Sequence, residues 1–120
     1  MDKIGFKLSA IHYSLLVKKN MIIYEITAKV QKELVERFEK FMREKHIPDL
    51  LATEYFVGAE MARFSENRYR IRYEAVDKTS LDEYFSKDAE RLRQDFLSHF
   101  PEGVKLSREI LGVLQVWKKD

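Results

Sequence analysis

Residues 21–117 are predicted to form an α+β domain whose strands and helices follow the order βαββαβ. Three observations lead to this prediction. Apolar and polar side chains alternate along residues 21–30 and 68–76, as they do in half-buried strands. Residues 31–46 and 80–100 instead repeat apolar side chains every three to four positions, as amphipathic helices do. No repeat, low-complexity stretch or long linker interrupts this order.

The first and third predicted strands each have one apolar and one polar face. In the first strand, residues 21–30, the apolar face carries Ile22, Tyr24, Ile26, Ala28 and Val30. The second and third strands, 53–66 and 68–76, surround a turn at Glu66 and Asn67. In the third strand the apolar face carries Tyr69, Ile71, Tyr73 and Ala75, and the charged face carries Arg68, Arg70, Arg72 and Glu74.

The two helices have predicted ends. Pro48 disfavours the α conformation at Ile47, so the first helix should stop near His46. The second helix should begin at Ser80, whose hydroxyl would form an S-x-x-E capping box with Glu83. The last strand is predicted over residues 104–117.

This order describes a ferredoxin-like sandwich, in which two helices cover one face of a four-stranded antiparallel sheet. The other face would be bare, yet residues 110–117 are apolar on both faces. We therefore expect a second copy of the chain to cover the sheet. The interface should contain Leu111, Val113 and Trp117, with Glu25, Arg70 and Arg72 in ion pairs between strands or between subunits.

Residues 1–20 are predicted to be an N-terminal extension to the domain formed by residues 21–118, because the βαββαβ order is complete without them. Their apolar spacing fits neither a helix nor a strand clearly. The alternative to a dimer is that this extension folds over the bare face of the sheet itself.

Composition narrows the possible functions. The chain has 120 residues, 22 basic against 20 acidic side chains and no cysteine. Such a balanced charge argues against a partner that is nucleic acid or a membrane surface, and the lack of cysteine fits the cytoplasm. The same βαββαβ order also builds the RNA recognition motif, but the third strand, RYRIRYEAV, lacks the glycine and exposed aromatics of that motif.

Three segments resemble a known family. They are FMREKHIPDLLAT at residues 41–53, YRIRYE at 69–74, and Ala89 with Leu92 and Arg93. The chain is similar to a bacterial family of unknown function, number 4286 among such families, within the dimeric α+β barrel superfamily. The resemblance implies a homodimer that pairs sheet to sheet. Superfamily relatives include quinone-forming monooxygenases, small-molecule isomerases, haem-degrading enzymes and stress-induced proteins, so fold alone does not assign an activity.

His46 is the first candidate site residue, because it extends the apolar stripe of the first helix towards the helix–sheet cleft. It could act as a general base or bind a substrate, with Asp49 orienting it. The simpler interpretation is a histidine that caps the end of a helix. His99, near the end of the second helix, is a candidate ligand-binding residue with the same simpler interpretation.

Tyr24, Tyr69 and Tyr73 form an aromatic stripe on the helix-facing side of the sheet. Tyr24 and Tyr73 could assist His46 in catalysis and Tyr69 could contact a ligand, although such stripes are more often plain core. The three histidines lack metal-binding spacing, so we expect no metal and no cofactor.

The sequence therefore predicts a homodimer that binds a small molecule in the helix–sheet cleft. One alternative is an enzyme of the cofactorless monooxygenase or isomerase kind. Another is a stress or interaction protein with no pocket.

Overall fold

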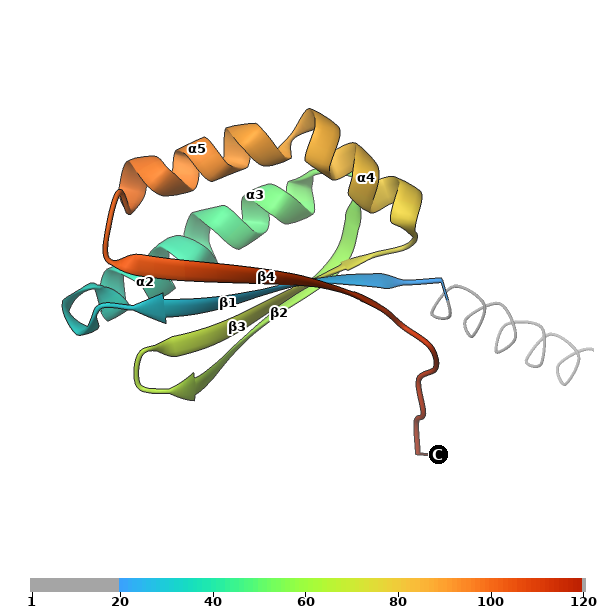
Figure 1. Ribbon diagram of the computed structural model, residues 1–120, viewed down its shortest axis with the longest axis horizontal. Coiled ribbons are helices and arrows are strands. Elements are labelled where there is room, and N and C mark those ends of the chain that lie inside the picture. Colours follow the sequence, from blue (N-terminus) through green and yellow to red (C-terminus); the bar gives the residue numbers. More distant parts are fainter. Residues whose placement is uncertain (1–19, 120) are drawn as a thin grey trace, which may run out of the picture.

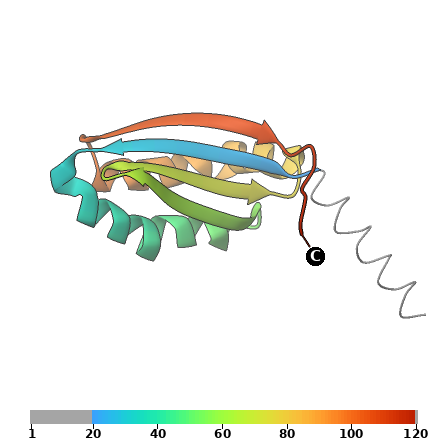
Figure 2. The same cartoon turned by 90° about the horizontal axis from the view of Figure 1, so that it is seen from below.

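The computed structural model describes residues 20–119 and confirms the predicted α+β fold. Four antiparallel strands form one sheet: β1 (Ile22–Val30), β2 (Phe56–Ser65), β3 (Arg68–Ala75) and β4 (Val104–Gly112). Their order is β2-β3-β1-β4, so β1 lies between β3 and β4 (Figure 2). The extension predicted over residues 1–20 lies, apart from Asn20, outside the described residues.

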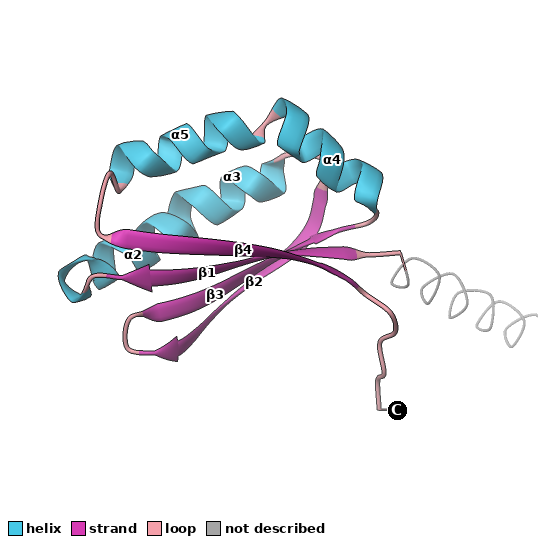
Figure 3. Ribbon diagram, in the orientation of Figure 1, coloured by secondary structure: helices cyan, strands magenta, loops and turns pink. Residues whose placement is uncertain are grey.

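The helices of residues 20–119 all lie on one side of the sheet, as Figures 1 and 3 show. The first helical region contains α2 (Val35–Phe41) and α3 (Ile47–Ala52), and the second contains α4 (Lys78–Lys87) and α5 (Ala89–His99). None of the helices within residues 20–119 is long and apolar enough to cross a membrane. The cytoplasmic location stays a prediction from sequence.

The first helical region does not stop near His46, so that prediction was wrong. A π-helical turn over Met42–His46 connects α2 to α3, and the Ile47 amide donates to the Met42 carbonyl instead of the usual carbonyl one residue later. Pro48 then occupies the start of α3, where its missing N–H matters least. The wide turn lets the helix accommodate a proline that would otherwise end it.

The second helical region also begins differently from the prediction. Its N-cap is Asp77, whose carboxylate accepts a 2.8 Å hydrogen bond from the Ser80 amide. The predicted Ser80–Glu83 capping box is therefore wrong by one helical turn, because the aspartate three residues earlier satisfies the free amides. The region is split at Asp88, whose φ of −126° and ψ of −21° depart from helical values and separate α4 from α5.

The sequence predicted that the last strand would end at Trp117, but β4 ends at Gly112. β1 begins at Ile22, which pairs with Gly112, so β1 provides no strand partner for the residues after Gly112. One further hydrogen bond joins the Val113 amide to the Met21 carbonyl at 3.0 Å. Residues 113–119 continue as a C-terminal arm that leaves the sheet (Figure 3).

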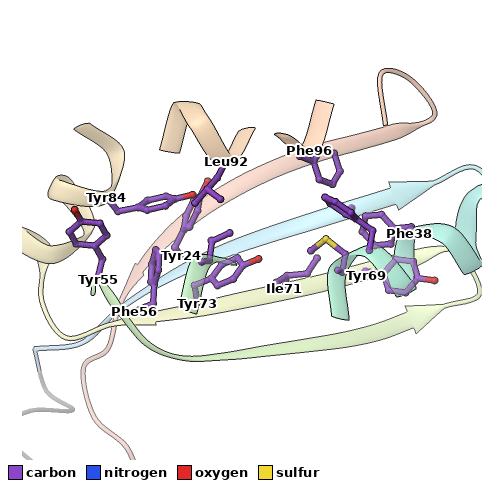
Figure 4. Close-up of a cluster of buried hydrophobic side chains, with 14 of the residues drawn as sticks. Tyr24, Phe38, Tyr55, Phe56, Tyr69, Ile71, Tyr73, Tyr84, Leu92 and Phe96 are labelled. Carbon is purple, nitrogen blue, oxygen red and sulfur yellow. The ribbon is translucent and has the colours of Figure 1, made fainter. Parts of the chain in front are cut away.

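The core lies between the helices and the helix-facing side of β1 and β3, and it is rich in aromatic rings (Figure 4). Phe38 from α2 packs on Tyr69 from β3 with ring centroids 5.0 Å apart, and Phe56 from β2 packs on Tyr84 from α4 at 4.8 Å. Each large ring removes considerable apolar area from water, which stabilises the contact between the two layers.

Candidate functional site

A cavity of about 250 Å³ lies between the helices and the sheet. Its apolar wall is built by side chains from both layers: Ile26, Phe38, Met42, Leu50, Ile71 and Phe96. Its polar lining consists of Tyr24, His46, Tyr84, Glu90, Arg93 and Arg108. A mostly apolar cavity with a few converging polar groups is the usual form of a small-molecule site.

His46 reaches this cavity because of the π-helical turn. Phe38, Met42, His46 and Leu50 recur every four residues, and all four are buried. In a regular α-helix, each step of four would rotate the side chain by about 40° away from the previous one. The extra residue in the π-helical turn reduces this rotation, so His46 stays on the face that looks towards the sheet.

The His46 imidazole is held among aromatic rings and not by hydrogen bonds. It stacks on Phe41, with ring centroids 5.6 Å apart, and meets the edge of Phe96 at 5.5 Å. The side chain is only 9% exposed, and within residues 20–119 its Nδ1 atom has no hydrogen-bond partner. A buried polar atom without a partner is uncommon and calls for an explanation.

Burial lowers the pKa of His46 to about 4. The carboxylates of Asp95 and Asp49 oppose this shift, but both form ion pairs with Lys45, at 2.8 Å and 3.0 Å. His46 is therefore neutral at neutral pH. A neutral imidazole has one nitrogen that donates a hydrogen bond and one that accepts.

Two tyrosines from different layers line the cavity with His46. Tyr24 comes from β1 and Tyr84 from α4, with ring centroids 6.1 Å apart (Figure 4). Burial raises the pKa of both hydroxyls, so both keep their protons at neutral pH. Tyr24 was a predicted site residue, whereas Tyr84 was not.

The charged residues of the cavity were not recognised in the sequence. Glu90 and Arg93 lie on α5 and form an ion pair with each other. Arg108 lies on β4 opposite Ile26, a position whose side chain points to the helix side of the sheet. An arginine at an inward position of a strand is the signal that could have identified it.

Four predicted site residues do not line the cavity. Tyr73 is fully buried in the core, and the Tyr69 hydroxyl donates a 2.6 Å hydrogen bond to Glu39 on α2. Asp49 pairs with Lys45. The His99 Nδ1 atom lies 2.9 Å from the Asp95 carbonyl oxygen, so His99 takes the helix-end position that the simpler interpretation gave to both histidines.

The predicted charged face of the sheet is present on the side away from the helices. Glu25 on β1 lies 3.7 Å from Arg70 and 3.0 Å from Arg72 on β3, which makes these ion pairs interstrand. The Nε atom of Arg72 lies close to the Glu25 carboxylate but without hydrogen-bond geometry. This buried Nε atom therefore has no hydrogen-bond partner within residues 20–119. Leu111 lies on the same face, opposite Ile23.

Across the described part of the chain, no group of three or more acidic or histidine side chains could hold a metal ion.

His46 should make stability depend on pH. The unfolded chain takes up a proton at His46 near pH 6.5, whereas the folded chain does so only near pH 4. Between these values the unfolded state binds more protons, so the free energy of unfolding should fall by about 2 kcal/mol from pH 7 to pH 5 because of this residue. Urea unfolding at both pH values should show this loss in the wild type and in the exposed control His99→Gln. An equal loss in His46→Gln would contradict it.

Comparisons with known proteins agree with the fold. The family model described as Domain of unknown function (DUF4286) matches residues 21–114, and no curated protein sequence matches the chain. A Caulobacter crescentus CB15 protein, provisionally assigned as an antibiotic biosynthesis monooxygenase, is 17% identical with a TM-score of 0.64, covering 87% of this chain and 99% of its own. SnoaB, a cofactor-independent oxygenase from Streptomyces nogalater, is 10% identical with a TM-score of 0.63, covering 83% and 99%.

A conserved protein from Methanosarcina mazei Go1 is also similar, at 17% identity and a TM-score of 0.58, covering 77% of this chain and 93% of its own. Identities this low show a shared fold, and they do not assign an activity to this chain. The family model, in contrast, covers most of the chain and confirms the resemblance stated from the sequence. The chain belongs to the DUF4286 family.

Proposed function

We propose that this protein binds a small, largely apolar molecule in the cavity between its helices and its sheet, and that it does so as a homodimer. The observation that carries the first part is His46, whose buried imidazole lines the cavity and whose Nδ1 atom has no hydrogen-bond partner in the described chain. Leaving such a polar atom unsatisfied costs about 1–3 kcal/mol. A ligand that hydrogen-bonds to the imidazole would recover part of this cost.

The cavity offers complementary contacts for such a ligand. The neutral imidazole of His46 and the protonated hydroxyl of Tyr24 can each donate or accept a hydrogen bond. The rings of Phe38 and Phe96 provide apolar surface against which a flat apolar group can pack. These features support a ligand with an apolar body and one or two polar groups.

A second candidate function is that of an enzyme of the cofactorless monooxygenase or isomerase kind. The specific observation in its favour is that a possible base, His46, and a possible hydrogen-bond donor, Tyr24, line the same cavity. The likeness to SnoaB, a cofactor-independent oxygenase, is in keeping with this candidate. With a pKa near 4, however, the imidazole is a weak base in the empty cavity. The third interpretation, an interaction protein without a pocket, lacks support because a cavity is present.

The proposed homodimer is supported by apolar side chains at and beyond the end of β4. Leu111 lies on the open face of the sheet, and the C-terminal arm carries Leu114 and Trp117, which are 87% and 79% exposed. Covering each with a second copy would contribute about 1.5–3 kcal/mol. Charge also fits, because β3 presents Arg70 and Arg72 while β4 presents Glu109, so a two-fold related sheet can bring opposite charges together.

The binding proposal predicts that His46→Gln loses ligand affinity while His99→Gln does not. A thermal-shift screen of quinones, phenols, haem and small acids on the full chain should yield at least one compound that raises the melting temperature. Titration calorimetry with that compound should then show about a tenfold loss of affinity in His46→Gln, as expected for one buried hydrogen bond. The absence of any hit, or equal affinities in both variants, would contradict the proposal.

The dimer proposal predicts that Leu111→Arg converts the protein to a monomer. Light scattering on the wild type should give about twice the chain mass of 14.4 kDa, and the variant should give the single mass. Leu97→Arg is the matched control, because Leu97 is similarly exposed, at 43% against 37%, but lies on α5 away from the open sheet face. A monomeric wild type at high micromolar concentration would contradict the dimer.

A further inference from the structure

We propose that the ligand of this cavity is a small organic monoanion, whose apolar body packs against the aromatic wall and whose acidic group binds at the end lined by Arg93 and Arg108. This inference rests on the proposed binding function and adds the charge of the ligand to it. It depends on which charges face the cavity, which of them are already neutralised, and where the uncharged polar groups lie.

Two basic residues and one acidic residue line the cavity, which gives the lining a net positive charge. Its charged residues are Glu90, Arg93 and Arg108. Glu90 is already occupied, because it forms an ion pair with Arg93 and accepts a 3.1 Å hydrogen bond from Gln94. Arg108, in contrast, forms no ion pair and no side-chain hydrogen bond with any of residues 20–119. The guanidinium group of Arg108 is therefore available to a ligand.

Arg108 occupies an inward position on an edge strand, between Leu106 and Ile110 on the same face of β4. Leu106 lines the cavity beside it. A charged side chain of an edge strand would be expected on the opposite face, with Lys105, Ser107 and Glu109. The inward position instead brings Arg108 to the lining of the cavity, where it remains exposed and therefore accessible to an entering anion.

The two tyrosine hydroxyls lie within the electrostatic reach of this arginine. Burial raises the pKa of Tyr24, and the guanidinium groups of Arg108 and Arg93 partly oppose that rise. Burial raises the pKa of Tyr84 as well, and Arg108 again opposes it. Because both hydroxyls stay protonated, each can donate a hydrogen bond to an anionic oxygen held by Arg108.

The remaining polar group of the cavity does not compete with an anion. His46 is neutral, and the nearby carboxylates of Asp49 and Asp95 are paired with Lys45. An approaching anion therefore meets a neutral donor or acceptor at His46. One unpaired guanidinium group and a wide apolar wall match a single negative charge on an apolar molecule better than a multiply charged phosphate.

The experiment compares 1-naphthoate with its neutral isostere 1-naphthamide by titration calorimetry on the full chain. The anion should bind at least about tenfold more tightly, as expected for a charge-assisted hydrogen bond in place of a neutral one. Arg108→Gln should weaken naphthoate about tenfold and leave naphthamide within about twofold. Lys87→Gln removes the same charge from an exposed position paired with Glu83, and should leave both affinities unchanged.

Each other outcome contradicts a defined part of the proposal. Equal binding of naphthoate and naphthamide would overturn the inference about charge and leave the binding function standing. Equal weakening by Lys87→Gln and Arg108→Gln would show that overall charge, and not the cavity arginine, attracts the anion, which also overturns the inference. Binding of neither compound at millimolar concentration would contradict both the inference and the binding function.

Discussion

The structure depends on burying one face of the two central strands, β1 and β3, beneath the helices. Ala28 on β1 and Tyr73 on β3 are both fully buried there. Because β1 pairs with β3 on one side and with β4 on the other, its alternation determines which side chains of both neighbours face the helices. A shift of one residue in β1 would move Tyr24 out of the cavity and Glu25 into it. The cavity and the charged open face are thus two consequences of the same register.

The cavity follows from how the helices cover the sheet. Aromatic side chains fill the layer above β1 and β3, but the inward side chains of β4 remain partly exposed, among them Leu106 at 41%. The π-helical turn over Met42–His46 directs an imidazole into the space that remains, where its Nδ1 atom has no hydrogen-bond partner among residues 20–119. An apolar wall, a neutral imidazole and an unpaired arginine then lie around one volume. Shape and charge together favour an amphipathic ligand.

The sequence was sufficient for the strand order and for the faces of β1 and β3, because period-two alternation is direct evidence for both. It was insufficient where a residue's role depended on its tertiary neighbours. Pro48 normally marks a helix end, and only the wide turn before it lets the helix continue. The end of β4 was set by where β1 begins and not by the apolar run after Gly112. Arg108 was overlooked because the polarity of β4 hides which of its faces points inward.

The central claim is that His46 is a buried, neutral residue that lines a binding cavity. The most direct test is its pKa, measured by NMR from the pH dependence of the imidazole resonances, with His46→Gln used to assign them among the three histidines of the chain. The structure predicts a midpoint near 4 in the free protein, because burial outweighs the nearby carboxylates. A midpoint near 6.5 would show a solvated side chain and would contradict the account.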